Sequence, residues 1–146
     1  MLSTLKCPIC RSFVMPKVNR GLNVSCEDCK YLIHPVSQEE IEALKIPVHD
    51  VIKKKESGEN FLLLDVRGKD EYETTHINFA KLIPLNELPK SLAQLPKDKE
   101  IVCHCHHGGR SMTAARFLSQ HGFKAKSMDG GIDAWSLLVD SSVRRY

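Results

Sequence analysis

The feature that most constrains the fold is a buried strand that leads through a glycine-rich loop directly into a helix. The apolar run Ile101-Val102-Cys103 predicts a strand over residues 101–105, and Gly108-Gly109 lets the chain turn after it. Apolar side chains then recur at helical spacing over residues 109–121, and Gly122 is a typical helix-terminating residue. This order of elements is typical of α/β proteins with a parallel sheet.

Apolar runs and amphipathic stretches alternate over residues 61–146. The run Phe61–Val66 predicts a strand buried on both faces, and shorter strands are expected over residues 81–84 and 125–128. Helices are expected over residues 69–74, 86–94 and 132–139. The alternation predicts an α/β fold in which a parallel sheet is flanked by helices.

A polar segment over residues 36–60 precedes this region. Ser37 followed by Glu40 fits a capping box that begins a helix, and Pro47 ends the pattern. Val51 and Ile52 indicate a second short helix before residue 58. The lysines at 53–55 are interpreted as its solvent-exposed face.

Four of the six cysteines lie in the first 29 residues, as the pairs Cys7/Cys10 and Cys26/Cys29. Each C-x2-C pair forms a tight turn that directs two sulfurs to one point, so two pairs predict a tetrahedral S4 site. We expect one structural zinc ion there, with iron as the lesser alternative and disulfides less favoured. A hairpin turn is expected over residues 18–22. A segment of about 35 residues needs such a metal to fold, and it resembles a zinc ribbon.

Charge and hydropathy argue against some functional classes. The formal net charge is +3, and residues 1–35 account for it with five basic and two acidic side chains. Four thiolates around one Zn²⁺ would nearly cancel this excess, so nucleic-acid binding is not favoured. No apolar run is long enough to cross a membrane, and the N-terminus shows no secretory signal. A cytoplasmic location is expected.

Cys105 lies where the expected strand ends and the helix begins. The loop and the first helical residues that follow it are His106, His107, Gly108, Gly109, Arg110 and Ser111. Successive N–H groups of such a loop, together with the helix N-terminus, favour an anion at its centre. The arginine adds a fixed cation, and the serine adds a hydroxyl that can bond the sulfur. Cys105 is therefore expected to be a nucleophilic thiolate, with the two histidines pointing outward.

Spacing, burial and strand alternation argue against three alternatives. Cysteine phosphatases use Cys-x5-Arg, whereas four residues separate Cys105 from Arg110, and the shorter ring suits one sulfur atom better than the oxyanion of a phosphatase or arsenate reductase. Cys103 is interpreted as a buried apolar residue rather than a second reactive thiol. Alternation along the strand directs His104 to the opposite face from the cysteines, so these side chains are not expected to share a metal.

Several motifs occur in the order found in rhodanese-like sulfurtransferases, which this chain resembles over about residues 46–140. They are LLLDVR at 62–67, Glu71, His76-Ile77, IPLNEL at 83–88, CHHGGRS at 105–111, Ala114, Leu118, Gly122-Phe123 and GGIDAW at 130–135. The resemblance implies a persulfide on Cys105, with Asp65 and Arg67 as supporting residues near the loop. Residues 75–80 depart from the family's usual Gly-His-Ile and Pro-Gly-Ala pattern, so this connection is expected to differ in shape.

We therefore expect a zinc-ribbon-like metal module over residues 1–35, a helical connector that begins the rhodanese domain over 36–60, and the core of that domain over 61–146. The expected activity is transfer of sulfane sulfur from thiosulfate or a similar donor to a thiophilic acceptor, with Cys105 and Arg110 as catalytic residues. The alternative is a binding or regulatory sulfur-relay module that docks a protein partner through the zinc ribbon. Nucleic acid and membrane are not expected partners.

Overall fold

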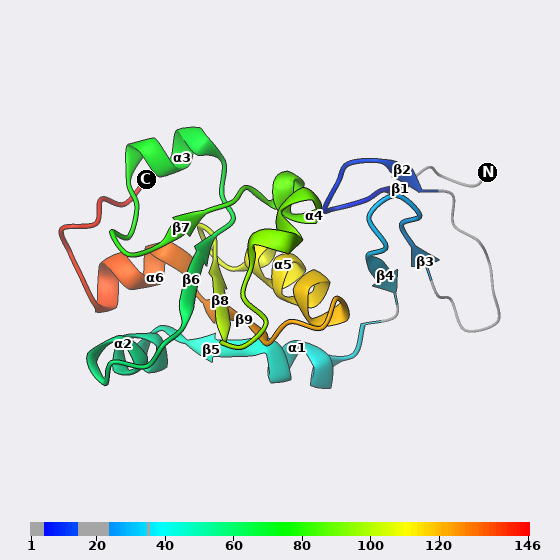
Figure 1. Ribbon diagram of the computed structural model, residues 1–146. Helices are drawn as coiled ribbons and strands as arrows, with labels where there is room; N and C mark the ends of the chain where they lie inside the picture. The colour runs from blue at the N-terminus through cyan, green and yellow to red at the C-terminus, as the bar shows by residue number, and fades with distance from the viewer. Residues whose placement is uncertain (1–4, 15–23, 35) are drawn as a thin grey trace.

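The computed structural model describes residues 5–14, 24–34 and 36–146, and most of it is a five-stranded parallel sheet with helices on both faces (Figure 1). The strands lie in the order β5-β9-β8-β6-β7, so β8 is central. Their bounds are β5 Lys45–Pro47, β6 Leu62–Asp65, β7 Lys81–Leu82, β8 Ile101–His104 and β9 Ala125–Asp129.

Helices connect the strands and confirm the α/β fold that the sequence predicts. Their bounds are α1 Gln38–Leu44, α2 Val48–Glu56, α3 Lys69–Thr74, α4 Leu88–Ser91, α5 Gly109–Gln120 and α6 Gly131–Leu138. Short 3-10 turns, η1 Leu85–Glu87 and η2 Leu92–Gln94, flank α4.

The structure differs from the expected elements in three places. Strand β5 is additional to them, because three residues at a sheet edge are too few to show a strand pattern. The single helix expected over 86–94 is split into η1, α4 and η2, since Pro89 lacks the N–H that would continue a helix from η1. Ser37 begins α1 as expected, its Oγ accepting from the Glu40 N–H at 3.1 Å, but the Glu40 carboxylate accepts from Arg116 Nε at 3.1 Å instead of closing the capping box.

Each face of the sheet packs against its own layer. On one face, α5 and the segment formed by η1, α4 and η2 cover Leu64, Ile101 and Cys103. On the other face, α2 and α6 cover Leu63 and Val102. Because successive residues of a strand point to opposite faces, β6 and β8 are buried on both sides, as their continuous apolar runs predict.

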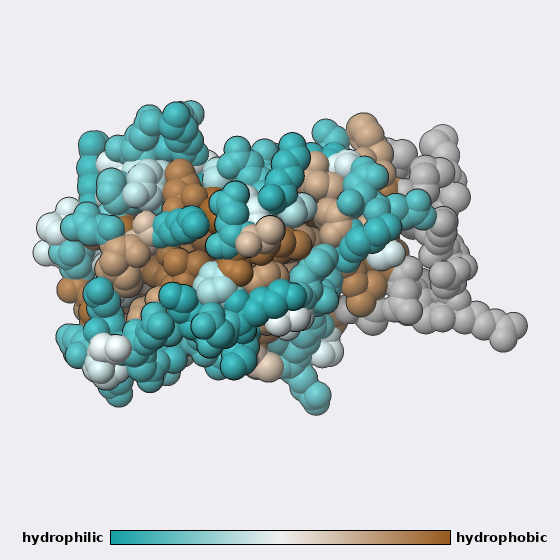
Figure 2. All heavy atoms as spheres, in the orientation of Figure 1, coloured by the Kyte–Doolittle hydropathy of each residue, from teal (hydrophilic) through white to brown (hydrophobic). Residues whose placement is uncertain are grey.

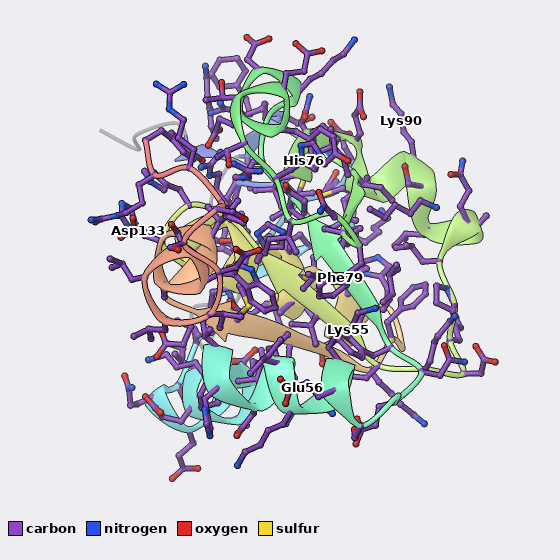
Figure 3. All side chains as sticks on the ribbon, turned by 90° about the vertical axis from the view of Figure 1, so that its left-hand side faces the viewer. Lys55, Glu56, His76, Phe79, Lys90 and Asp133 are labelled. Atoms are coloured by element: carbon purple, nitrogen blue, oxygen red, sulfur yellow. The ribbon has the colours of Figure 1, made fainter. Side chains whose placement is uncertain are left out.

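The connection between α3 and β7 adds apolar side chains to the second face. Ile77 is buried, and the Phe79 ring packs edge-on against Phe61 and Trp135, with centroid distances of 6.4 and 5.8 Å. Lys55 of α2 extends over Phe79, with its Nζ 4.5 Å from the ring centroid (Figure 3). The segment that departs from the family pattern is thus held by packing against α2 and α6.

The N-terminal module is a small β region ahead of the sheet. It contains two antiparallel pairs, β1 Leu5–Lys6 with β2 Phe13–Val14 and β3 Val24–Ser25 with β4 Leu32–His34. The hairpin turn expected over residues 18–22 lies outside the described residues. In Figure 1 the module lies beside α5, at the end of the molecule away from α2 and α6.

Direct contacts dock the module on α5. Arg116 Nη1 donates to Tyr31 Oη at 2.7 Å, and the Gln120 side chain hydrogen-bonds both the N–H and the carbonyl of Leu32, at 2.8 and 3.0 Å. The Tyr31 ring lies 6.3 Å from the Phe117 ring, and the module and α5 share one hydrophobic core. Because α5 starts at the cysteine loop, these contacts fix the module relative to that loop.

The surface of this fold is mixed. On the face shown in Figure 2, hydrophilic residues cover α2 and α3, and hydrophobic residues are visible between them, over the sheet. Phe13, Leu137 and Leu138 are exposed apolar side chains. Within the described ranges, every helix is too short or too polar to cross a membrane.

Candidate active site and four-cysteine centre

Cys7, Cys10, Cys26 and Cys29 converge between the two strand pairs. All four Sγ atoms lie within 4.8 Å of one another, with 3.6 Å between those of Cys7 and Cys29 and 3.5 Å between those of Cys10 and Cys26. Thiolates about 2.3 Å from a zinc ion occupy the corners of a tetrahedron with edges of about 3.8 Å. The donor set and its spacing therefore fit one structural metal ion.

The two cysteine turns have the same backbone shape. The Arg11 N–H donates to the Cys7 carbonyl at 3.1 Å, and the Lys30 N–H donates to the Cys26 carbonyl at 2.8 Å. Arg11 and Lys30 both adopt the left-handed backbone, with φ of 67° and 62°. Each turn therefore ends in an exposed basic residue at an equivalent position.

Cys105 follows the carboxyl end of β8 and is 2% exposed. Its Sγ accepts from the N–H of Gly108 at 3.1 Å and from the N–H of Ser111 at 3.4 Å, and it lies 3.4 Å from Ser111 Oγ. Two backbone donors directed at one sulfur favour negative charge on that sulfur or on an atom bonded to it.

The N-terminal end of α6 holds the outer side of this loop. The Ile132 N–H donates to the Cys105 carbonyl at 2.8 Å, and the Asp133 N–H donates to the His106 carbonyl at 3.2 Å. Gly108 has a φ of 131°, which side chains rarely tolerate. These two carbonyls thus point toward α6, while N–H groups on the other side of the loop point toward the sulfur.

Ser111 links the start of α5 to the neighbouring strand. Its buried Oγ lies 2.8 Å from Ser127 Oγ of β9 and donates to the Gly108 carbonyl at 3.1 Å. Ser127 is also the register partner of Cys103. The serine at 127 was outside the expected site, because one hydroxyl in a short strand has no sequence signature.

Arg110 is held by a carboxylate from α3. Its Nη1 and Nη2 donate to the two Glu71 carboxylate oxygens at 2.6 and 3.0 Å. Tyr146 Oη donates to Glu71 Oε2 at 2.6 Å and accepts from Arg67 Nη1 at 3.0 Å. The hydrogen bonds from Arg110 lower the pKa of Glu71 to about 2, so Glu71 is ionised at neutral pH. The sequence marked Glu71 as a motif residue without a role, and it did not point to Tyr146.

An aromatic stack covers the loop. The Tyr146 ring stacks on the His106 ring, with centroids 4.1 Å apart and planes 11° apart. The His106 ring in turn stacks on His107, at 3.9 Å. His107 is exposed and His106 is partly exposed, so the loop histidines do not surround the sulfur.

Asp65 and Arg67 form a fully buried ion pair beside the site. Arg67 Nη2 donates to Asp65 Oδ2 at 2.7 Å and to the Thr75 carbonyl at 2.7 Å. The Arg67 N–H also donates to Asp65 Oδ1. These contacts fix the turn between β6 and α3, which is the element that supplies Glu71.

Strand β8 leads into the loop and directs His104 and Cys103 to opposite faces of the sheet. His104 faces Asp65, with 3.7 Å between Nε2 and Oδ2, and burial lowers the pKa of His104 to about 4. Cys103 is fully buried in the core on the other face. In the described part of the chain, the only group of side chains placed to hold a metal is the four N-terminal cysteines.

Comparison with known proteins places this site in a family. A family model described as Rhodanese-like domain matches residues 48–138. The matched range contains the cysteine loop, Asp65, Arg67 and Glu71, and it begins after the four-cysteine module. The site geometry and the family match therefore concern the same part of the chain.

Individual relatives agree with this match. "Putative sulfurtransferase YtwF" of Bacillus subtilis is 35% identical over 95 residues, which are 65% of this chain and 92% of that protein. "Thiosulfate sulfurtransferase GlpE" of Coxiella burnetii is 31% identical over 87 residues, 59% of this chain and 78% of that protein. Two further curated relatives are longer, and the match spans 38% and 39% of their length.

A solved structure shows the same architecture. The rhodanese-like domain protein of Staphylococcus aureus superposes with a TM-score of 0.62 at 26% identity, covering 70% of this chain and 97% of that one. The sheet, the loop and the family model all agree with the resemblance found in the sequence. This chain therefore belongs to the rhodanese-like domain family.

Proposed function

We propose that this protein is a sulfurtransferase that carries sulfane sulfur as a persulfide on Cys105. One observation carries the proposal: Cys105 Sγ accepts from the N–H groups of Gly108 and Ser111, at 3.1 and 3.4 Å, inside a loop of six residues. Such donors suit both a thiolate and the outer sulfur of a persulfide. The names of the relatives support sulfur transfer as the chemistry.

The first half-reaction begins when the Cys105 thiolate attacks the outer sulfur of thiosulfate or a similar donor. The S–S bond of the donor breaks, its electron pair leaves with sulfite, and Cys105 gains a persulfide. Arg110, held by Glu71, is the cation that attracts the donor's oxyanion and stabilises charge on the leaving group. The attacking form is the thiolate, whose charge the two N–H donors of the loop stabilise, so the sulfur transfer itself moves no proton.

In the second half-reaction, a thiophilic acceptor attacks the outer sulfur of the persulfide. The S–S bond at Cys105 breaks, and its electron pair returns to Sγ as a thiolate. The two N–H groups that hold the sulfur in the resting loop again stabilise that thiolate. The same two N–H groups therefore serve both halves of the cycle.

The four-cysteine module is proposed to be structural. Cys7, Cys10, Cys26 and Cys29 would hold one zinc ion, with iron as the lesser alternative, and bound zinc would crosslink two strand pairs that have little core of their own. A relay that docks a protein partner through this module is the second candidate function. It is favoured by Phe13 of β2, which is 71% exposed.

Substitution of the two loop-proximal cysteines tests the proposal. We expect Cys105→Ser to abolish transfer of sulfur from thiosulfate to cyanide, measured as thiocyanate. Cys103→Ala, which removes a buried thiol two residues away, should keep most of the activity. Full activity in Cys105→Ser would refute the proposal.

A further inference from the structure

Ser111 lies between the sulfur of Cys105 and a serine of the neighbouring strand. Its Oγ is 3.4 Å from Cys105 Sγ and 2.8 Å from Ser127 Oγ, and it donates to the Gly108 carbonyl at 3.1 Å. Ser111 is fully buried and Ser127 is 2% exposed, so both hydroxyls are shielded from bulk solvent. The hydrogen bonds in this cluster are therefore set by the donors and acceptors of the protein itself.

The direction of the hydrogen bond between the two serines follows from these donors and acceptors. Within the described ranges, the Ser127 hydroxyl has Ser111 Oγ as its one hydrogen-bond partner. If Ser111 donated to Ser127, the hydrogen of Ser127 would be buried without an acceptor, which is costly. Ser127 therefore donates and Ser111 accepts, which leaves the single hydrogen of Ser111 for another acceptor.

The hydrogen of Ser111 has two acceptors within reach, and the charge on the sulfur decides between them. While Cys105 is a thiol, its S–H donates to Ser111 Oγ, and Ser111 donates to the Gly108 carbonyl. When the thiol loses its proton, the negative sulfur becomes the stronger acceptor. The Gly108 carbonyl keeps the N–H of Met112, which donates to it at 3.0 Å. The Ser111 hydroxyl can therefore turn to the sulfur without leaving that carbonyl unpaired.

We propose that Ser127 is a positioning residue for sulfur transfer and that it acts through Ser111. The inference rests on the proposed sulfurtransferase function. The Ser127 hydroxyl occupies one lone pair of Ser111 Oγ, so the Ser111 hydrogen is directed away from Ser127 and toward the loop. There it becomes a third donor to the Cys105 thiolate, beside the N–H groups of Gly108 and Ser111. The hydrogen bond that Ser111 accepts also polarises its hydroxyl and strengthens its own donation.

The place of Ser127 in the fold suits this role. It lies in β9, between β8 and β5, and it is the register partner of Cys103 on one side and Lys45 on the other. Ser111 lies in the first turn of α5, directly after the loop. A donor on a paired strand therefore holds Ser111 Oγ in place while charge appears and disappears on the sulfur.

Three serine variants of the full chain test the role. Ser127→Ala removes the donor, and Ser111→Ala removes the hydroxyl through which it acts. Ser136→Ala is the matched control, because Ser136 is also buried but its hydroxyl donates to the Val143 carbonyl. The measurement is the rate at which iodoacetamide, an uncharged reagent, alkylates Cys105 from about pH 5 to about pH 10. Fragmentation of the labelled peptide locates the modified cysteine.

The charged groups around the loop are the same in all of these variants. They are Arg110 with its partner Glu71, and the two loop histidines, His106 and His107. Their influence on the sulfur is therefore common to every protein compared, and a difference between pH profiles reports the hydroxyls.

Losing a donor to the thiolate favours the protonated thiol, so the alkylation profile should shift to higher pH. We expect a shift of about 0.5 pH units for Ser127→Ala, about 1 for Ser111→Ala and none for Ser136→Ala. Adding Ser127→Ala to Ser111→Ala should give no further shift, because Ser127 acts through Ser111. At high pH, where the sulfur is ionised in every protein, the rates should become similar.

Transfer kinetics should follow the same pattern. With thiosulfate as donor and cyanide as acceptor, Ser127→Ala should lower kcat/KM by about threefold at pH values where the thiol is only partly ionised. The difference from the wild type should disappear at higher pH. Should Ser127→Ala fail to fold, Ser127→Cys keeps the size of the side chain with a weaker donor, and it should shift both profiles in the same direction.

Profiles that do not shift in Ser127→Ala or Ser127→Cys would overturn the inference. The same shift in Ser136→Ala, or a further shift in the double variant, would also overturn it, because Ser127 would then not act through Ser111. The alkylation assay uses no sulfur donor. Absence of thiosulfate-dependent transfer in the wild type would therefore overturn the proposed function, whereas the alkylation profiles would still report the link between the serines and the sulfur.

Discussion

A Cβ atom on Gly131 would lie 2.5 Å from the carbonyl oxygen of Cys105, closer than any stable contact allows. This approach lets α6 begin against the cysteine loop, where the Ile132 N–H binds the same carbonyl. Gly131 also has a φ of 61°, in the left-handed region. The start of α6 and the sulfur-bearing loop are therefore one packed unit that requires glycine.

We predict that Gly131→Ala displaces the loop and lowers both stability and activity. The left-handed backbone and the steric overlap together should cost about 3 kcal/mol in the free energy of unfolding. Sulfur transfer should fall by at least about tenfold, because the N–H groups around Cys105 move. Denaturant unfolding and thiocyanate formation measure the two effects.

Gly58→Ala is the control for backbone strain. Gly58 has a φ of 75°, but a Cβ there meets nothing within 4 Å. This variant should lose about 1 kcal/mol of stability and keep its transfer activity. If Gly131→Ala were as active and as stable as Gly58→Ala, the loop would not depend on its contact with α6.

Glu71 and Tyr146 are predicted to act by positioning Arg110. Glu71→Gln removes the charge that holds the guanidinium and should lower kcat/KM for thiosulfate by about tenfold. Tyr146→Phe keeps the stack on His106 but loses the hydroxyl bonded to Glu71, so its loss should be about threefold.

The ion pair between Lys54 and Glu59 provides the comparison for these variants. It is exposed and remote from the loop, so Glu59→Gln should leave kcat/KM unchanged. In Glu71→Gln, added salt should also affect thiosulfate kinetics differently from the wild type, because the guanidinium of Arg110 no longer has a fixed carboxylate partner. Wild-type kinetics in Glu71→Gln would show that Arg110 needs no anchor.

His104 is predicted to make the fold sensitive to acid. Burial lowers the pKa of His104 to about 4, whereas an unfolded histidine titrates near about 6.5. Between these values the unfolded chain binds more protons, so the free energy of unfolding falls as the pH falls from about 6.5 to about 4. Through His104 alone, the free energy of unfolding changes by up to about 1.4 kcal/mol per pH unit in this range. Above about pH 6.5 this contribution to stability is fully present.

The variant His104→Leu should remove this part of the pH dependence. Neither ring nitrogen of His104 has a hydrogen-bond partner among the described residues, so leucine should leave stability at pH 8 unchanged or raised. Urea unfolding of both proteins at several pH values between 4.5 and 8 makes the comparison. Parallel stability curves for the two proteins would contradict the assignment.

The four-cysteine centre is predicted to bind one zinc ion per chain and to support α5. Removing the metal by chelation or by Cys10→Ser should loosen the module and its contacts through Tyr31 and Arg116, lowering Tm by about 10 °C. Metal analysis and thermal unfolding measure this. Cys103→Ala should keep the full metal content, and an absence of zinc and iron from the purified wild type would contradict the prediction.

Local pattern was sufficient for much of the fold and for the centre of the site. The continuous apolar run at 61–66 and the strand, loop and helix at 101–121 correspond to β6, β8 and α5. The spacing of the four cysteines predicted their convergence, because each turn needs only neighbouring residues to form.

The remainder of the site depends on contacts between distant parts of the chain. Arg110 meets Glu71 across 39 residues, and Tyr146 meets Glu71 across 75. Such pairs have no local signature, so the sequence showed an arginine but not the carboxylate that fixes it. The overlap at Gly131 involves Cys105, 26 residues earlier in the sequence (131 − 105), and the cavity between the first cysteine turn and the start of α5 requires two parts of the chain to be docked together.

The central claim is that Cys105 carries the transferred sulfur, and mass spectrometry of the thiosulfate-treated protein tests it most directly. The thiols and persulfides are alkylated before the protein is digested. We predict that the peptide containing Cys105 gains about 32 Da, the mass of one sulfur atom, and that it loses this mass when cyanide is added. A peptide without this gain, or sulfur located only on Cys103 or on the N-terminal cysteines, would contradict the account.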